Sequence, residues 1–162
     1  MAWQASCGAY KFIKKENGVV KSFDILNLRF KIMATFHRFE DLEIWQTAKK
    51  LSLKVFKLTE VGPSSKDFKF RDQIRSSAGS VMDNIAEGLE RSGQFEFVNF
   101  LSISKGSSGE VRSQLYRGID QNYFPENTCE LIKEYDELAS KISGFMKYLN
   151  QSEIRGQKFK DR

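Results

Sequence analysis

The side chains that most often carry out catalysis or bind metals are sparse in this chain of 162 residues. It has a single histidine, His37, and two cysteines, Cys7 and Cys129. One histidine excludes every two-histidine mechanism, and no cysteine stands at a metal-ligand spacing from it. We therefore expect neither a metal site nor a cofactor.

Three glutamates, Glu87, Glu96 and Glu110, are the remaining candidates for a catalytic carboxylate pair. Surface and structural roles are far commoner for such residues than acid–base catalysis. Gly106 and Gly109 lie within a helical pattern and do not follow a strand, so they do not form a phosphate-binding loop. We expect that the protein is not an enzyme.

A group of lysines points to a different chemistry, the binding of phosphate. Lys50, Lys54 and Lys57 fall on one face of the first predicted helix, which has no acidic residue between Glu43 and Glu60. Phosphate contacts need only such cations and no base-reading motif. The candidate nucleic-acid-binding residues are Lys49, Lys50, Lys54, Lys57, Lys66, Lys69 and Arg71.

The same lysines have two other interpretations. They form a solvated helix face, or they pair with the acidic start of the fourth predicted helix, which contains Glu130, Glu134, Asp136 and Glu137. No aromatic residues are clearly interleaved with the lysines, so the sequence does not support base stacking on a single strand.

The second predicted helix carries a stripe of polar residues that recur at steps of four and three, the spacing of a face that meets another helix. This stripe consists of Gln73, Ser77, Ser80, Asn84, Glu87 and Arg91. In the third helix, Ser104, Gly106, Ser107 and Ser108 are small enough to let a neighbouring helix approach closely.

Pairing these two helices antiparallel about the Arg91–Ser92 turn gives a specific register. It places Ser80 near Ser104 and Ser77 near Ser107. The same register predicts a partly buried ion pair between Arg75 and Glu110, of a kind that fixes register more than it stabilises a fold.

Helical periodicity governs the chain from residue 39 onward, and it predicts helices over about residues 40–59, 65–89, 94–119 and 127–149. Short loops join them, so we expect an all-α fold, an antiparallel up-down-up-down four-helix bundle. The expected core positions include Leu42, Trp45, Ala48, Val55, Phe56, Ile74, Ala78, Val81, Ile85, Phe97, Leu101, Ile103, Val111, Leu115, Leu131, Tyr135, Leu138, Ile142 and Leu149.

Composition and charge divide the chain into an N-terminal extension (1–35), the bundle (36–150) and a polar, basic tail (151–162). Residues 1–32 carry six Lys or Arg against two Asp or Glu, a net charge of +4, whereas the remaining residues carry 20 against 19, a net charge of +1. The extension has two interpretations: a short hairpin over residues 10–25, or a non-native or weakly structured segment upstream of Met33, which we favour because a lone hairpin is marginally stable. Two cysteines and no long apolar run favour a reducing cytoplasm and no membrane partner.

Three motifs resemble the family of 23S rRNA-intervening-sequence proteins, and the resemblance spans about residues 36–149. In chain order they are Phe39-Glu40-Asp41-Leu42 with Trp45 and Ala48; Gln73-Ile74-Arg75, Ser80-Val81 and Asn84-Ile85-Ala86-Glu87-Gly88; and Phe100-Leu101, Ser104, Gly106-Ser107 and Glu110. One departure is Met82, where many members have proline. Members usually begin near the first motif, which supports Met33 as a natural start.

The resemblance implies a bacterial, cytoplasmic four-helix bundle that forms ring-shaped homopentamers. Some members are encoded inside insertions in 23S rRNA genes. A related branch comprises accessory proteins of diversity-generating retroelements, which bind reverse transcriptase and nucleic acid. The structural and assembly residues assigned by motif and spacing are Gln73, Arg75, Ser77, Ser80, Asn84, Glu87, Gly88, Ser104, Gly106, Ser107 and Glu110.

The sequence therefore favours a non-enzymatic, oligomeric scaffold or adaptor that binds structured RNA or a nucleoprotein, such as a reverse transcriptase complex, through the lysines of the first helix. The alternative is a protein–protein assembly module that makes no contact with nucleic acid. A salt-sensitive affinity for RNA separates the two, because only phosphate binding releases counterions.

Overall fold

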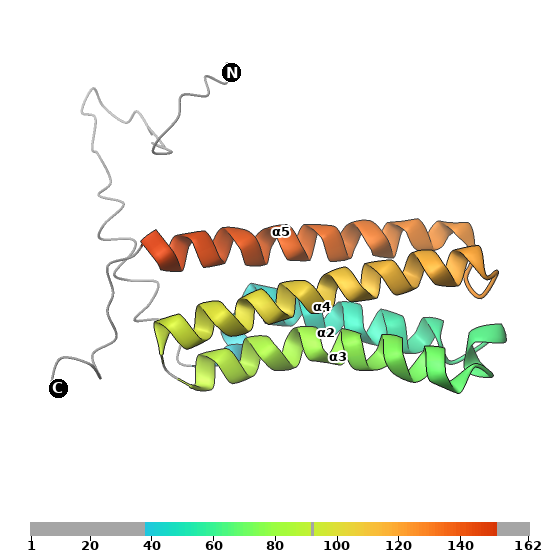
Figure 1. The fold of residues 1–162 in the computed structure, drawn as a ribbon, viewed down its shortest axis with the longest axis horizontal. Helices are drawn as coiled ribbons and strands as arrows, with labels where there is room; N and C mark the ends of the chain where they lie inside the picture. Colours follow the sequence, from blue (N-terminus) through green and yellow to red (C-terminus); the bar gives the residue numbers. More distant parts are fainter. Residues whose placement is uncertain (1–37, 92, 152–162) are drawn as a thin grey trace, which may run out of the picture. The chain divides into compact units, whose positions relative to one another are not determined.

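The computed structural model describes residues 38–91 and 93–151, which lie within the second of two units, Phe36–Arg162. These described residues form four α-helices and no strand, so the predicted all-α four-helix bundle is confirmed (Figure 1). The helices are α2 (Glu43–Leu58), α3 (Phe68–Glu90), α4 (Gln94–Asp120) and α5 (Cys129–Gln151). Short 3₁₀ turns, η1 (Phe39–Asp41), η2 (Pro63–Ser65) and η3 (Glu126–Thr128), precede α2, α3 and α5. The predicted hairpin, Met33, His37 and residues 152–162 of the tail lie outside the described residues.

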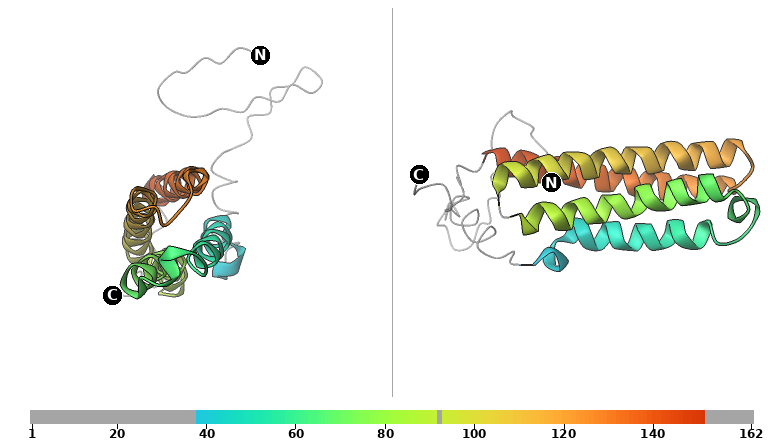
Figure 2. Two further views of the ribbon diagram at one scale, coloured as in Figure 1. Left: turned by 90° about the vertical axis from the view of Figure 1, so that its right-hand side faces the viewer. Right: turned by 60° about the horizontal axis from the view of Figure 1, so that its bottom comes forward.

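Hydrogen bonds between α3 and α4 show that these helices are antiparallel. Gln73 of α3 is bonded to Arg117 of α4, and further along α3 Ser80 is bonded to Ser107, which lies earlier in α4. Two ion pairs between α2 and α5 have the same antiparallel order. The two views of Figure 2 show the helices following one another around the bundle, with α3 and α5 at opposite corners.

The connection between α2 and α3 is shaped by three residues. Gly62 has φ 76°, in the left-handed region that favours glycine, and Pro63 then opens η2. The Asp67 side chain accepts a hydrogen bond of 3.0 Å from the Phe70 N–H and so caps α3. The second helix therefore begins at Phe68, slightly later than the pattern predicts.

Most of the predicted core is confirmed. Ile74, Val81 and Ile85 of α3 are fully buried, as are Leu101, Val111 and Leu115 of α4 and Tyr135, Leu138, Ile142 and Leu149 of α5. Burying each large side chain contributes roughly 1.5–3 kcal/mol to the driving force for folding.

Two predicted core residues are exposed: Phe56 is 44% exposed and Ile103 is 45% exposed. Phe56 follows the fully buried Val55. Successive residues of a helix point about 100° apart, so Phe56 lies at the margin of the apolar stripe and reaches the surface.

Candidate functional site

Serine hydroxyls join α3 and α4 along the stripe that the sequence singles out. The Ser80 and Ser107 Oγ atoms are 3.0 Å apart, and the buried Ser104 hydroxyl donates a 2.7 Å hydrogen bond to the Val81 carbonyl. Small side chains bring the two backbones together, and each hydroxyl finds a partner there. Ser80, Ser104 and Ser107 therefore belong to the helix interface, as predicted.

The predicted register between α3 and α4 is wrong by about one helical turn. The partner of Ser80 is Ser107, where the prediction names Ser104, and the partner of Ser77 is Glu110, where it names Ser107. The prediction paired residues that are equally distant, along the chain, from the turn between the two helices. Which residues face the other helix depends on the rotation of each helix about its axis.

The predicted ion pair between Arg75 and Glu110 is also wrong. Arg75 Nε donates a 2.8 Å hydrogen bond to Thr59 Oγ1, and Arg75 Nη2 lies 3.3 Å from the Phe56 carbonyl, so this side chain crosses to α2. Glu110 Oε2 instead lies 3.2 Å from the Ser77 hydroxyl. Residues 75 and 77 are about 200° apart around α3, so one reaches α2 and the other reaches α4.

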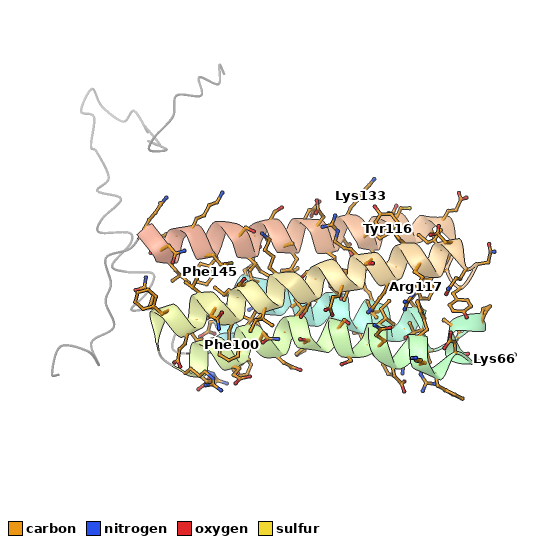
Figure 3. All side chains as sticks on the ribbon, in the orientation of Figure 1. Lys66, Phe100, Tyr116, Arg117, Lys133 and Phe145 are labelled. Atoms are coloured by element: carbon orange, nitrogen blue, oxygen red, sulfur yellow. The ribbon has the colours of Figure 1, made fainter. Side chains whose placement is uncertain are left out.

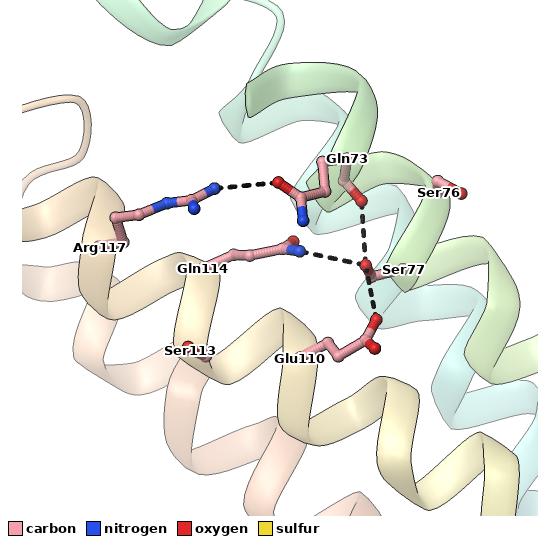
Figure 4. Close-up of a pocket in the computed structure, with 7 residues that line it drawn as sticks. All are labelled: Gln73, Ser76, Ser77, Glu110, Ser113, Gln114 and Arg117. Atoms are coloured by element: carbon pink, nitrogen blue, oxygen red, sulfur yellow. Dashed lines mark hydrogen bonds between the residues drawn. The ribbon is translucent and has the colours of Figure 1, made fainter. Parts of the chain in front are cut away.

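A polar pocket of about 450 Å³ opens between α3 and α4 (Figure 4). It is lined by Gln73, Ser76, Ser77, Glu110, Ser113, Gln114 and Arg117. Gln114 Nε2 donates to Ser77 Oγ at 3.2 Å, and Arg117 Nη2 donates to Gln73 Oε1 at 3.2 Å. Gln114 Oε1 is buried without a partner among the described residues. Sequence reasoning missed Gln114 and Arg117, although both follow Glu110 at helical spacing on the same side of α4.

The last part of the polar stripe is satisfied within α3 itself. Asn84 Nδ2 donates to the carbonyl and the hydroxyl of Ser80, at 2.7 and 2.9 Å, and Glu87 pairs with Arg91 at 2.6 Å. These hydrogen bonds join side chains one turn apart. Neither Asn84 nor Glu87 bonds to α4 in the part of the chain that the structure describes.

Gly88 and Gly106 have opposite surroundings. A Cβ atom on Gly88 would lie 2.7 Å from Phe100 Cβ and 2.9 Å from Phe97 Cδ2, so this glycine admits the two aromatic side chains of α4. A Cβ on Gly106, or on the neighbouring Gly109, would meet nothing within 4 Å. Gly88 therefore has a packing role inside the bundle, whereas packing within the chain does not account for Gly106.

The central lysine of the predicted patch has a carboxylate partner. Lys54 Nζ lies 2.6 Å from both carboxylate oxygens of Glu134 on α5. This pair confirms, for Lys54, the interpretation in which the lysines face the acidic start of the fourth helix. Glu43 and Lys141 form a second pair at 2.6 Å along the same two helices, which lowers the pKa of Glu43 and raises that of Lys141.

The other predicted cations lie on several sides of the bundle. Lys49 Nζ is 5.5 Å from the ring centroid of Trp45, Arg71 lies over Phe68 and pairs with Asp72, and Lys69 lines a small depression with Arg117. Lys66 lies at the end of the bundle where α2 leads into α3 (Figure 3). Lys54 therefore lies toward α5 and Lys69 toward α4, so the seven residues do not all face the same neighbouring helix.

Five of these cations are nevertheless available for an external partner. Lys49, Lys50, Lys57, Lys66 and Lys69 are all exposed. None of them takes part in an ion pair with any residue of 38–91 or 93–151.

Sequence reasoning also missed aromatic residues that lie beside cations. Arg75 Cζ is 4.2 Å from the ring centroid of Phe56, and Arg71 Cζ is 4.8 Å from that of Phe68. Both pairs involve arginines, so they leave untested the prediction that no aromatic residues are clearly interleaved with the lysines. Phe56 was assigned to the core, and the arginine on the neighbouring helix has no fixed sequence spacing from it.

Asp67 and Tyr123 connect the start of α3 to the loop before α5. The Tyr123 hydroxyl donates a 3.0 Å hydrogen bond to Asp67 Oδ2. The Phe70 N–H, followed by this hydroxyl, lowers the pKa of Asp67, and the same contact raises the pKa of Tyr123. These shifts belong to a helix cap and are consistent with a structural role.

Two kinds of feature are absent from the described residues, a metal-ligand cluster and a membrane-spanning helix. No three His, Cys, Asp or Glu side chains come close enough together there to hold a metal ion. None of the described helices is both long and apolar enough to cross a lipid bilayer.

Fold and surface together define a class of protein, a four-helix bundle whose α3 and α4 meet along a serine-rich polar interface. The chain belongs to the family of 23S rRNA-intervening sequence proteins, and the family match covers residues 40–144. No curated protein matches the chain significantly.

A crystal structure at 1.70 Å resolution has the same fold. It is that of a protein of unknown function from the S23 ribosomal protein family of Bacteroides thetaiotaomicron VPI-5482. The TM-score is 0.60 at 19% sequence identity, over 64% of this chain and 95% of that chain. The likeness is one of fold.

Proposed function

We propose that this protein is a non-catalytic, cytoplasmic adaptor that self-associates and binds structured RNA or a nucleoprotein. The observation that carries the nucleic-acid part is the set of five exposed lysines on α2, on the α2–α3 connection and on α3 that have no ion-pair partner among the described residues. A phosphate backbone supplies the missing negative charge and needs no groove or base-reading side chain.

The outer side of α4 supports self-association. Glycine within an exposed helix costs about 1 kcal/mol relative to alanine, yet Gly106 and Gly109 have open space where a side chain would fit. Ile103 and Tyr116, on the outer half of the same helix, are 45% and 53% exposed. A second copy that packs closely against α4 would account for both features. A ring of five copies remains an expectation from the family.

The nucleic-acid part is tested by titrating the full, nuclease-treated chain with a structured RNA at low and at moderate salt. The diagnostic variant is Lys50→Glu/Lys57→Glu/Lys66→Glu. Lys54 is left unchanged, because a carboxylate there would repel Glu134 and disturb the bundle. We expect tight binding at low salt that falls steeply as salt rises and is lost in the variant.

The matched control changes the same charge elsewhere. Lys105, Lys133 and Lys147 are exposed on α4 and α5, and Lys133 projects away from the other helices (Figure 3). Replacing these three by glutamate should leave RNA binding within about twofold of the wild type, since only contacts at the binding face release counterions. Equal losses in the two triple variants would show that net charge alone governs binding, and would contradict the assignment.

Self-association is tested by Gly106→Leu with Gly144→Leu as its control. Both glycines lie in helices and have nothing within 4 Å of an added Cβ, so neither change strains the monomer. Light scattering should give a smaller mass for Gly106→Leu and an unchanged mass for Gly144→Leu. An unchanged mass for both would remove α4 from the proposed interface.

A protein–protein assembly module without nucleic acid is the second candidate. The pairing of Lys54 with Glu134 favours it, because the residue at the centre of the predicted patch is already neutralised. Absence of RNA binding at either salt, together with a mass above that of the monomer, would establish this candidate over the adaptor.

A further inference from the structure

Two exposed aromatic rings lie under arginines along the edge where α2 meets α3. Phe56 is 44% exposed and Phe68 is 64% exposed. Arg75 covers one face of the first ring and Arg71 covers one face of the second, at 4.2 and 4.8 Å from the ring centroids. We call these four residues the stacking edge.

Hydrogen bonds hold both arginines in place. Arg75 donates to Thr59 Oγ1 and to the Phe56 carbonyl, and Arg71 Nη1 lies 3.3 Å from the Ser65 carbonyl. Arg71 and Arg75 are one turn apart on the same face of α3, so the two ring–guanidinium pairs follow one another along the edge. The rings are therefore presented to solvent by ordered neighbours.

The surroundings of the stacking edge are rich in cations. Residues 56–75 contain five Lys or Arg and three Asp or Glu, a net charge of +2. Two of the three acidic side chains are engaged, Asp67 as the cap of α3 with Tyr123 as a second partner, and Asp72 in its pair with Arg71. Lys57 and Lys66 are exposed and without an ion-pair partner in the described residues.

Exposed rings alternating with cations have the composition of a single-strand binding platform. A nucleobase stacks on any flat π surface, and such stacking contributes enough that loss of one ring weakens binding severalfold or more. An arginine plane stacks on bases as readily and also binds phosphate. In a duplex the bases already stack on one another, so these rings have no base to receive.

We propose that the stacking edge binds single-stranded nucleic acid, with bases stacked on Phe56 and Phe68 and phosphates contacted by Lys57 and Lys66. This inference rests on the nucleic-acid part of the proposed function and adds the substrate class, an unpaired strand or loop. It also adds to the contact Phe56, Phe68 and Arg75, which are not members of the predicted lysine patch.

The test compares a fluorescein-labelled oligouridylate with an RNA duplex of the same length, by fluorescence anisotropy on the full chain at low salt. The variants are Phe68→Ala and Phe56→Leu. The control is Phe95→Ala, since Phe95 is 89% exposed at the start of α4, at the opposite end of the bundle (Figure 1). Circular dichroism confirms that each variant is folded, which exposed positions allow.

We expect the oligouridylate to bind more tightly than the duplex. Phe68→Ala and Phe56→Leu should each weaken that binding at least about fivefold, whereas Phe95→Ala should change it less than twofold. Duplex binding should be the same in all four proteins, because phosphate contacts do not involve the rings.

Four results would overturn the inference. If the duplex binds as tightly as the single strand, or if Phe68→Ala behaves like Phe95→Ala, the stacking edge does not read bases, although phosphate binding by the lysines stands. If neither RNA binds, this inference and the nucleic-acid part of the proposed function fail together. If Phe68→Ala lowers the oligomer mass while leaving RNA affinity unchanged, the edge is a contact between copies of the chain.

Discussion

Tyr135 provides a sharp test of the packing in this bundle. Its side chain is fully buried in α5, and its hydroxyl has no hydrogen-bond partner among the described residues. Burial, with a smaller contribution from the charge of Glu134, raises the pKa of this phenol. The neutral hydroxyl therefore loses its hydrogen bonds to water on folding and forms no hydrogen bond with the described residues in their place.

Replacing Tyr135 by phenylalanine should stabilise the protein. An unsatisfied buried polar group costs about 1–3 kcal/mol, and removing one oxygen leaves a void that costs less than about 1 kcal/mol. The net effect is a gain of about 1 kcal/mol in the free energy of unfolding. For a domain of this size that gain corresponds to a rise of about 4 °C in Tm.

The assay is urea and thermal unfolding of the full chain followed by circular dichroism, with two other tyrosines as controls. Tyr116 is 53% exposed, so Tyr116→Phe should change the free energy of unfolding by less than about 0.5 kcal/mol. Tyr123 donates a hydrogen bond to Asp67, so Tyr123→Phe should lower Tm. The three substitutions delete the same atom and should give three different results.

A Tyr135→Phe variant that melts below the wild type would refute the reasoning. It would mean that the hydroxyl has a partner, such as a buried water molecule, that offsets its desolvation. A result equal to that of Tyr116→Phe would mean that the cost of burying the hydroxyl and the cost of the void cancel.

Three further predictions concern the turn between α3 and α4, the start of α3 and the α2–α5 contact. Gly88→Ala should cost about 1–3 kcal/mol in urea unfolding despite the better helix propensity of alanine, because the added methyl overlaps two phenylalanine side chains of α4; an unchanged midpoint would show that α4 shifts freely. The pKa of Asp67 is lowered by its hydrogen bonds to the Phe70 N–H and the Tyr123 hydroxyl, so its stabilising effect is complete above its unfolded-state pKa and disappears as pH falls through the folded-state pKa. Asp67→Asn keeps a helix cap without the charge, so its Tm should fall less than that of the wild type between about pH 5 and pH 2, and parallel curves would contradict this. A double-mutant cycle on Lys54 and Glu134, with both residues changed to alanine, should give a coupling of about 0.5 kcal/mol, since both side chains are partly exposed, and a value well above 1 kcal/mol would be incompatible with a surface pair.

The candidate site was only partly predictable from the sequence. Helical spacing identified Ser77 and Ser80 as interface residues, because side chains three and four positions apart share a face of any helix. A run of small residues identified Ser107. It did not identify the partners of those residues, since the rotation of one helix against another depends on packing along its whole length. Gly88 shows the same limit: its motif marked it, but only the packed structure shows the two aromatic side chains that it admits.

The charge pattern of the sequence showed which helices are basic and which are acidic, but it did not show which side chains form ion pairs. The lysines of α2 and the glutamates of α5 are separated by about 80 residues, and the structure brings Lys54 and Glu134 within 2.6 Å. Arg75 differs from its prediction because two residues along a helix are enough to turn a side chain toward a different neighbour. Long-range partners of this kind follow from the antiparallel register of α2 with α5 and of α3 with α2.

The sequence by itself determined four amphipathic helices, their order, most of the buried apolar residues and the family. Those properties depend on local helix propensity and on the 3.6-residue period of the helix, and both are visible in the linear amino-acid sequence. Only the tertiary structure decided the register of α3 against α4, the neutralisation of Lys54, and the exposure of Phe56 and Phe68 beneath arginines. Each of these depends on how whole helices are rotated and displaced relative to one another. That arrangement is the one that leaves the fewest voids and unpaired polar groups in the entire core, so a local sequence pattern does not contain it.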